Sequence, residues 1–324
     1  MKRVLVTGGA GFVGRALVKK LVALDMDVSI VDDLSSGLDP KHWLSDAKPG
    51  QVAFYKTDLR DYLRSNKNSY WDTIFHLAAI VGGRLKIEYE PLQVATDLAI
   101  DSDLFRWLAT GDNHITKLIY FSSSAVYPLE LQTRPMHPAL NEAYVTPTSI
   151  RLGRPDMTYG WSKLTGEQLA YHAVTQHNCN VVIYRPFGGY GEGQSMDYPF
   201  PSIVQRVLNR EDPVVVWGSG KQRRDFIHID DCIEAVLASK DYLRPGQALN
   251  LGTGLGTSFE RLALTAGEVL GIPVNVINDA TKPEGVYARV ADTHFMRQFY
   301  TPKILLREGI KRVANSLTRV KESV

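Results

Sequence analysis

The chain has 324 residues, of which 44% are hydrophobic and 22% are charged, and its formal net charge is +2. This length has room for two lobes or one large α/β unit, and the mixed-sign charge excludes a general attraction to nucleic acid or to a membrane surface. No uncharged apolar run is long enough to span a bilayer, and the N-terminal "MKRVLVTGG" reads as a strand that enters a glycine turn rather than as a leader. We therefore expect a cytoplasmic protein. Cys179 and Cys232 have no partner at a metal-ligand or redox spacing, so we expect no metal site.

The first half of the chain alternates short apolar runs with segments of helical periodicity. Strands are predicted at 3–7, 27–31, 52–56, 73–77, 117–123 and 180–185, and helices at 13–25, 98–110 and 160–177. Such alternation favours a parallel sheet that helices cover on both faces, that is, a doubly wound α/β sheet of the Rossmann type.

The composition of the sequence changes after Arg185. The segment 186–202 is rich in Gly and Pro, which predicts a long irregular stretch. Beyond it the pattern predicts a smaller C-terminal α/β lobe, with helices at 203–210, 258–270 and 305–317 and strands at 214–217 and 247–254.

A glycine-rich turn follows the first predicted strand. In "TGGAGFVG" (7–14), Gly8, Gly11 and Gly14 stand where a tight turn, a close backbone approach and a helix N-terminus suit a pyrophosphate. Asp32 and Asp33 end the second strand, where a carboxylate accepts hydrogen bonds from ribose hydroxyls and repels a 2′-phosphate. No Arg occurs in the "LSSG" that follows, so the sequence predicts NAD rather than NADP.

The sequence "YGWSK" (159–163) places Tyr159 and Lys163 four residues apart, hence on one face of a predicted helix. A phenol has an ordinary pKa of about 10, and a nearby ammonium together with an oxidised nicotinamide favours the phenolate. Such a tyrosine can remove a hydroxyl proton while hydride leaves the same carbon. The alternative is a surface helix with an ordinary Tyr and Lys, which the preceding nucleotide motif disfavours.

With these motifs in order, the chain resembles the extended short-chain dehydrogenases/reductases of the NAD-dependent nucleotide-sugar epimerase/dehydratase family. The resemblance covers nearly the whole chain and rests on "TGGAGFVG", "DDLSSG", "TDLRD", "HLAA", "SSSAVY", "YGWSK", "RPFGGYG" and "GSGKQRRDFIHIDD". It implies an NAD-binding Rossmann domain at 1–185, to which 225–255 returns, and a nucleotide-sugar-binding lobe formed by 186–224 and 256–324. It also implies a homodimer through the helix that carries Tyr159 and Lys163.

The resemblance further assigns roles to individual positions. Ser123, four residues before Tyr127, is expected to hold the reacting sugar hydroxyl and to complete a catalytic trio with Tyr159 and Lys163. The implied cofactor contacts are Gly8, Gly11, Phe12, Val13, Gly14, Asp32, Asp33, Asp58, Leu59, Leu77, Ala78, Ala79, Tyr159, Lys163 and Phe187. The implied contacts to a nucleotide-diphosphate sugar are Gly82, Gly83, Arg84, Ser123, Ser124, Gly188, Arg224 and Arg289.

The two residues after Ser123 bear on the reaction. The family's 4,6-dehydratases carry Asp and Glu there, and its GDP-mannose 3,5-epimerases and GDP-fucose synthases carry Cys at the second position, whereas this chain has Ser124 and Ala125. The glycine loop at 76–84 nevertheless resembles that of these two GDP-sugar enzymes, and the segment 283–289 resembles the C-terminal lobe of the GDP-mannose 3,5-epimerases. We therefore expect an epimerase, with a GDP-sugar favoured, that transiently oxidises one hydroxyl, most simply at C4.

Two alternatives stay open at this point: a 4-dehydrogenase that releases the keto-sugar, and a non-catalytic NAD-sensing protein. Three departures from the family pattern also stand out. Gly188 and Asp97 each occupy a position where relatives usually have Asn, and the approach to the catalytic tyrosine, 144–157, is longer than usual.

Overall fold

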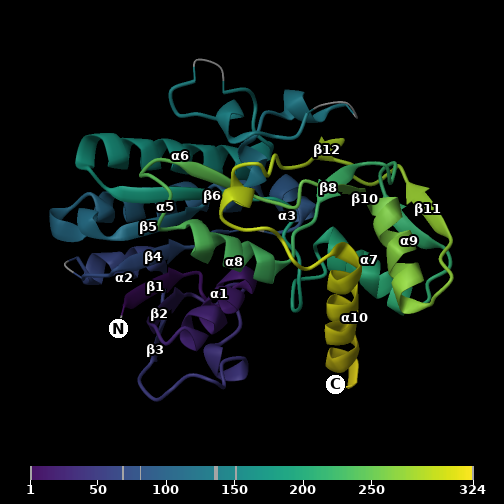
Figure 1. Cartoon of the computed structure of the whole chain (residues 1–324), viewed down its shortest axis with the longest axis horizontal. Coiled ribbons are helices and arrows are strands. Elements are labelled where there is room, and N and C mark those ends of the chain that lie inside the picture. The colour runs from purple at the N-terminus through teal and green to yellow at the C-terminus, as the bar shows by residue number, and fades with distance from the viewer. Residues whose placement is uncertain (1, 68, 81, 135–137, 150–151, 323–324) are drawn as a thin grey trace.

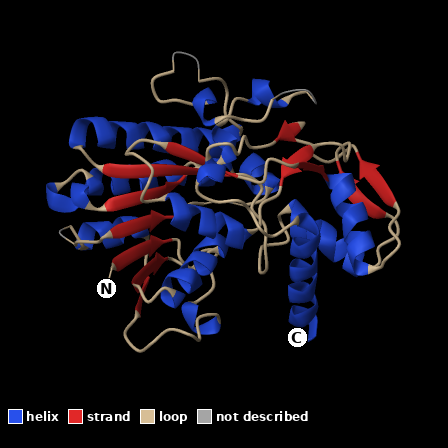
Figure 2. Cartoon of the chain, in the orientation of Figure 1, coloured by secondary structure: helices blue, strands red, loops and turns tan. Residues whose placement is uncertain are grey.

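The structure is a computed structural model that describes residues 2–67, 69–80, 82–134, 138–149 and 152–322 (Figure 1). It has a large sheet with helices at one end of the molecule and a smaller lobe at the other (Figure 2). None of the helices in these residues combines the length and the apolar character that a membrane crossing requires.

Within the described residues, a parallel sheet of seven strands forms the large body, in the order β3-β2-β1-β4-β5-β6-β9. The strands that build it are β1 (Arg3–Thr7), β2 (Asp27–Asp32), β3 (Val52–Lys56), β4 (Thr73–His76), β5 (Lys117–Phe121), β6 (Asn180–Pro186) and β9 (Ala248–Leu251). The order reverses between β1 and β4, which opens a crevice at their carboxyl ends, the usual place for a ligand in this architecture.

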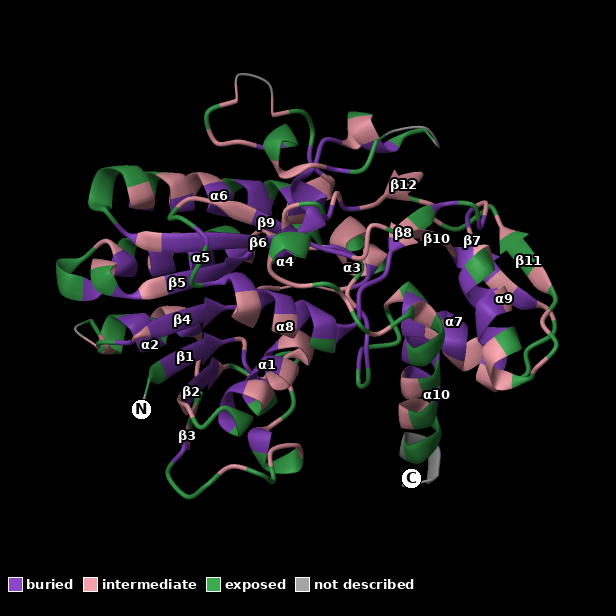
Figure 3. Cartoon of the chain, in the orientation of Figure 1, coloured by how far each residue is buried: buried purple, intermediate pink, exposed green. Residues whose placement is uncertain are grey.

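Helices cover both faces of this sheet. The first face packs α1 (Phe12–Ala23) and α8 (Ile229–Ser239) onto one apolar cluster. The second packs α2 (Leu59–Ser65), α5 (Thr96–Leu108) and α6 (Met157–His177) onto another. The central strands are buried on both faces, as Figure 3 shows, which explains their unbroken apolar sequences.

The smaller lobe has a core of its own. It contains α7 (Pro199–Leu208), α9 (Phe259–Leu270), α10 (Leu306–Glu322), a parallel pair β7 (Val214–Trp217) and β11 (Val276–Asp279), and a sheet of β10 (Gly256–Ser258), β8 (Arg223–Asp225) and β12 (Ala288–Arg289). The remaining helices are α3 (Arg84–Tyr89) and α4 (Pro91–Val94) and the 3-10 turns η1 (Pro40–His42), η2 (Gly111–Ile115), η3 (Ser124–Val126), η4 (Leu129–Gln132), η5 (Glu142–Tyr144) and η6 (Met296–Gln298).

The predicted doubly wound sheet and smaller α/β lobe are confirmed, with several boundary errors. Helix α6 begins at Met157 rather than 160, which places Tyr159 in its first turn. Helix α7 begins at Pro199, inside the stretch predicted as irregular, because proline is well suited to the first turn of a helix. Strand β5 ends at Phe121, so the serines stand beyond it. The domain boundaries stay a prediction.

Candidate active site

The close packing of the turn between β1 and α1 requires glycine at several of its positions. Gly8 has a φ of +67°, and a Cβ there would lie 2.7 Å from the backbone nitrogen of Ala78. A Cβ on Gly14 would overlap the Gly8 carbonyl oxygen and the Gly9 backbone. The turn therefore packs directly against α1 and the end of β4, as a dinucleotide-binding turn requires.

The N-terminus of α1 is open to an anion. Its N-cap is Gly11, no side chain caps it, and its first turn holds no acidic residue. A Cβ on Gly11 would meet only the Gly8 carbonyl oxygen, at 3.3 Å. Phe12 and Val13 begin the helix and are partly buried against the apolar cluster below. Free helix N–H groups beside open space fit a pyrophosphate.

The two aspartates after β2 differ. Asp32 is partly buried, and its carboxylate accepts the N–H groups of Ala10 and Leu34, each at 2.9 Å. Burial raises its pKa, while both backbone N–H groups act in the opposite direction. Asp33 is exposed and accepts the N–H of Ser35 at 2.8 Å. Asp32 thus ties the glycine turn to the end of β2, and Asp33 faces solvent.

The other predicted cofactor positions lie at neighbouring strand ends. Leu77, Ala78 and Ala79 follow β4 and are partly buried. Asp58 caps α2 and pairs with Arg60 at 2.6 Å, and its hydrogen bond to that side chain holds its pKa below the ordinary value.

Two further predicted cofactor positions are largely enclosed. Leu59 and Phe187 are buried, and the ring of Phe187 packs against Tyr127 with centroids 5.8 Å apart. Only the backbone of Phe187 is left to meet a cofactor.

The predicted catalytic trio comes from two elements. Tyr159 and Lys163 lie one turn apart on α6, and Ser123 is the N-cap of the 3-10 turn η3 after β5. The Ser123 hydroxyl accepts the Ala125 N–H at 3.1 Å and is hydrogen-bonded to Tyr159. A Cβ on Gly160 would lie 2.6 Å from the Ala125 carbonyl oxygen, so this glycine lets α6 approach the serine turn.

The ionisation of Tyr159 is finely balanced. Burial raises its pKa, the Lys163 ammonium lowers it, Asp97 raises it, and the hydrogen bond to Ser123 lowers it. The net shift is upward from the ordinary value of 10. The predicted effect of Lys163 is therefore present, but burial and nearby carboxylates outweigh it in the protein alone.

Beneath Tyr159 lies a set of buried polar groups that we term the inner cluster: His76, Asp97, Asp101, Tyr120 and Lys163. Asp97 and Asp101 stand one turn apart on α5, which packs against α6. Burial opposes the charge of Lys163, but Asp101 and then Asp97 prevail and raise its pKa.

Asp101 is fully supplied with hydrogen-bond donors. It accepts from the Tyr120 hydroxyl at 2.5 Å and from His76 Nε2 at 2.9 Å. His76 Nδ1 in turn lies 2.7 Å from the Thr7 hydroxyl, so the ring carries its proton on Nε2. Burial lowers the pKa of His76, which is therefore neutral. Burial favours protonation of Asp101, but Lys163 and these donors outweigh it and lower its pKa.

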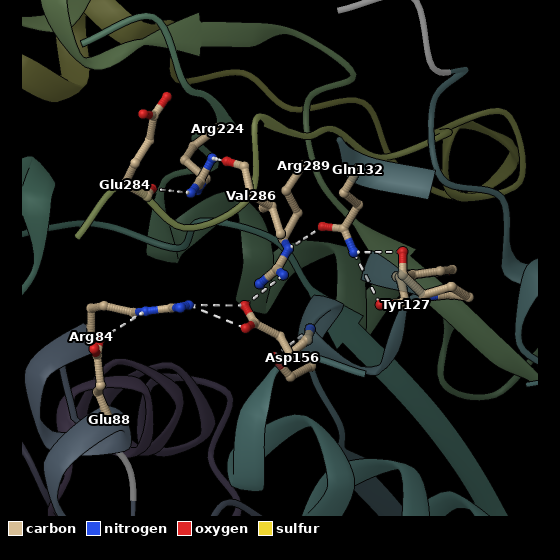
Figure 4. A network of polar contacts seen from close by, with 12 residues as sticks. Arg84, Glu88, Tyr127, Gln132, Asp156, Arg224, Glu284, Val286 and Arg289 are labelled. Atoms are coloured by element: carbon tan, nitrogen blue, oxygen red, sulfur yellow. Dashed lines mark hydrogen bonds and ion pairs between the residues drawn. The ribbon is translucent and has the colours of Figure 1, made fainter. Parts of the chain in front are cut away.

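On the lobe side stands the arginine cluster, defined by Arg84, Arg224, Arg289 and Asp156 (Figure 4). The Asp156 carboxylate receives Arg84 at 3.1 Å and Arg289 at 2.8 Å. Arg84 begins α3, Arg224 lies in β8, Arg289 ends β12, and Asp156 is the N-cap of α6. Despite partial burial, which favours the neutral acid, the two guanidinium groups hold the pKa of Asp156 below its ordinary value.

Among the residues that the structure describes, no carboxylate forms an ion pair with Arg224. Its guanidinium donates to the carbonyl oxygen of Val286 at 2.9 Å and to that of Glu284 at 3.5 Å, whereas the Glu284 carboxylate points away from it (Figure 4). That carboxylate accepts the Ser219 hydroxyl instead. Burial, followed by the like charge of Arg289, lowers the pKa of Arg224 to about 9. An under-neutralised guanidinium beside two others fits a multiply charged anion.

The remaining predicted substrate positions lie in the turns after β5 and β6 and in the loop before α3. Ser124 is buried in η3, and Gly82 and Gly83 precede α3, with Gly83 packed on the carbonyl of Asp197. Gly188 is exposed, and a Cβ there would lie 2.6 Å from the Asp225 carbonyl oxygen. Val81, Ile150 and Arg151, which belong to the glycine loop and the long approach segment, lie outside the described residues.

The comparisons place the chain among known proteins. The model of the NAD dependent epimerase/dehydratase family matches residues 4–252. A putative UDP-glucose 4-epimerase of Methanocaldococcus jannaschii is 28% identical over 96% of this chain and 97% of its own. A putative GDP-L-fucose synthase 2 of Arabidopsis thaliana is 25% identical over 96% and 90%. In fold, the chain is similar to the crystal structure of a UDP-glucose 4-epimerase with UDP-glucose from Thermotoga maritima, with a TM-score of 0.81 and 23% identity over 98% and 99% of the two chains.

Proposed function

Because the chain belongs to the NAD-dependent epimerase/dehydratase family and is an NAD-dependent enzyme of nucleotide-sugar chemistry, we propose that it is a nucleotide-sugar epimerase. The reaction is a transient oxidation of one sugar hydroxyl, at C4, followed by reduction from the opposite face. The observation that carries the proposal is the trio Ser123, Tyr159 and Lys163 without an added acid, base or thiol, since Ala125 fills the position next to Ser124.

Each member of the trio has one task in this proposal. Tyr159, as its phenolate, takes the proton of the sugar hydroxyl and as the phenol gives one back during reduction. Ser123, whose oxygen already accepts the Ala125 N–H, has its own O–H to donate to the reacting oxygen. Lys163 supplies the positive charge that lowers the pKa of Tyr159. NAD held by the glycine turn and the N-terminus of α1 would supply the acceptor and donor of hydride.

The cofactor and the substrate would occupy opposite sides of Tyr159. The glycine turn and the bare N-terminus of α1 would hold the NAD pyrophosphate, and Asp32 its ribose hydroxyls. The sugar diphosphate would lie against Arg224 and Arg289, because two cations at a diphosphate offset its charge. These placements bring the sugar between the arginine cluster and Tyr159.

The nucleotide base is the part on which the relatives differ. One is named as a GDP-L-fucose synthase and another as a UDP-glucose 4-epimerase. The resemblance of the glycine loop before Arg84 to the loop of the GDP-sugar enzymes favours GDP. UDP-sugars are the alternative to be tested beside it.

We further propose a homodimer through α5 and α6. Leu98 on α5 and Trp161 on α6 are exposed, at 38% and 51% of their surface, and these helices pack side by side. A Trp161→Glu variant should run as a monomer in size exclusion with light scattering if this face joins two copies. An equal molar mass for the variant and the unaltered protein would contradict the proposal.

The test of function is a panel of GDP-, UDP- and dTDP-sugars incubated with the purified protein, with products resolved by chromatography and mass. An isomer of unchanged mass, without lasting absorbance of reduced nicotinamide, supports the epimerase. A product two hydrogens lighter with accumulated reduced nicotinamide supports the 4-dehydrogenase instead. No change with any sugar would contradict both and favour a non-catalytic NAD-binding protein. The Tyr159→Phe protein serves as the control for contaminating activity.

A further inference from the structure

The inner cluster holds one carboxylate more than its cation needs. Lys163 is the cation of this cluster, and Asp101 already faces it with donors from Tyr120 and His76. Asp97 is a second carboxylate, 0% exposed, one turn away on the same helix. A buried carboxylate is costly unless it is paired and hydrogen-bonded, so its presence needs a reason.

Only one oxygen of Asp97 is satisfied. Oδ1 accepts the N–H of Ile80 at 2.6 Å, whereas Oδ2 is buried and has no hydrogen-bond partner among the described residues. A neutral amide would serve the Ile80 N–H equally well through its own oxygen. The hydrogen bonds therefore do not account for the charge.

The groups that the Asp97 charge acts on point to its role. They are Lys163 and Tyr159 from α6, Asp101 from α5 and Tyr120 from β5. The Lys163 Nζ lies 5.4 Å from the centre of the Tyr120 ring, whose hydroxyl donates to Asp101, one turn from Asp97. Lys163 attracts the carboxylate, Asp101 repels it, and Tyr159 is the proton-transferring group of the proposed reaction. A negative charge in this interior disfavours a second one on the Tyr159 phenol.

We propose that Asp97 is a positioning residue for the proton transfer. Its buried negative charge keeps Tyr159 protonated, as the phenol, until the positive charge of an oxidised nicotinamide enters the site. The inference rests on the proposed role of Tyr159 in proton transfer. Removing the Asp97 charge should let the Tyr159 phenolate form at lower pH. By Coulomb's law, one unit charge near a buried group shifts the pKa of that group by about one unit.

The alternative is a purely structural role, since Asp97 lies in the first turn of α5, where a carboxylate favours the helix dipole. That role would change stability and leave Tyr159 unaffected. The two roles therefore separate in a direct measurement of the Tyr159 ionisation.

The experiment is a pH titration of ¹³Cζ-tyrosine-labelled protein by NMR with saturating NAD and no sugar, in which Tyr159→Phe assigns the resonance. In Asp97→Asn the Tyr159 midpoint should fall by about one pH unit. Asp103→Asn is the matched control, because Asp103 lies on α5 but faces Arg64 and Arg106 at 3.5 and 3.9 Å. Its midpoint should equal that of the unaltered protein.

Should Asp97→Asn not fold, Asp97→Ser is a second neutral variant that keeps an acceptor for Ile80. A midpoint unchanged in either folded variant would overturn the proposal. Because no sugar is present, failure of the epimerase assignment leaves this result unaffected. With a substrate in hand, the pH profile of kcat for Asp97→Asn should shift to lower pH by the same amount, while KM stays unchanged.

Discussion

Two polar clusters flank Tyr159, and their charge imbalances are opposite. The inner cluster sets two carboxylates, Asp97 and Asp101, against one ammonium. The arginine cluster holds three guanidinium groups and one carboxylate, Asp156, which only Arg84 and Arg289 contact, and Glu88 lies 3.6 Å from Arg84 at its edge.

The difference separates two tasks. The inner cluster is sealed between α5 and α6, so its surplus charge can act only on its neighbours, above all on the ionisation of Tyr159. The arginine cluster is partly exposed, so its surplus positive charge can be neutralised by an incoming anion. The inner cluster thus influences the ionisation of Tyr159, and the arginine cluster is suited to bind an anionic ligand.

The largest expected effect comes from the group between the two clusters. Tyr159→Phe should lower turnover by about 10²- to 10⁴-fold, because positioned proton transfer contributes on that scale. Turnover is measured by product chromatography, and NAD content by absorbance. Tyr171→Phe, on the same helix with its ring against His172, is the matched control and should keep full activity. Full turnover in Tyr159→Phe would remove the basis of the proposed mechanism.

The arginine cluster predicts a loss of affinity rather than of chemistry. Arg224→Met should weaken the binding of UDP or GDP about 100-fold, since a buried charge-assisted contact to phosphate is lost. It should leave stability equal or higher, because the guanidinium lacks a carboxylate partner. Calorimetric titration measures the affinity.

The neighbouring Arg223 gives the control for that variant. Arg223 is exposed and donates to the Gly256 carbonyl oxygen at 2.8 Å. Arg223→Met should bind both nucleotides as the unaltered protein does. Equal losses in the two variants would show that the effect is general surface charge.

The inner cluster predicts a pH-dependent stability. Burial is the main reason that the pKa of Asp97 is raised from 3.8 to about 6. The folded protein thus holds this proton more tightly than the unfolded chain does, so the ionised group destabilises the fold above pH 6, and the cost disappears as the pH falls below about 4. Asp97→Asn should gain on the order of 2 kcal/mol at pH 8.

Urea unfolding at several pH values checks this prediction. The gain of Asp97→Asn should shrink steadily between pH 6 and pH 4 as the native carboxyl takes up its proton. A gain that is constant with pH would mean that the Asp97 charge is not its cause, and a loss at pH 8 would mean that this charge stabilises the fold.

The strand–helix alternation was enough to predict the sheet, because buried parallel strands leave continuous apolar runs such as 3–7 and 180–185. Tyr159 and Lys163 were predicted on one helix face, and both lie on α6. The short strands of the lobe, such as Ala288–Arg289, have too few residues for any periodicity. Helices α3 and α4 were missed because Pro91 breaks their pattern.

The cluster partners were beyond reach of the sequence for a different reason. Asp156 meets Arg84 and Arg289 across 72 and 133 positions, and only the packing of α3, α6 and β12 brings them together. Asp97 was noted as a departure from the family pattern, but its place beside Lys163 depends on how α5 packs against α6. The signal that had been available was a pair of acidic residues one turn apart, Asp97 and Asp101, at the start of the predicted helix 98–110.

In the proposed reaction, the hydrogen of the oxidised carbon would pass to bound NAD and back to the same carbon. It would therefore not exchange with solvent. The direct test is turnover of the active sugar nucleotide in D₂O, followed by mass spectrometry and proton NMR of the isolated isomer. We expect an epimer with no deuterium on carbon, because Ala125 leaves no acid, base or thiol next to Ser124 to exchange a carbon-bound proton. Deuterium on the inverted carbon or on its neighbour would contradict it.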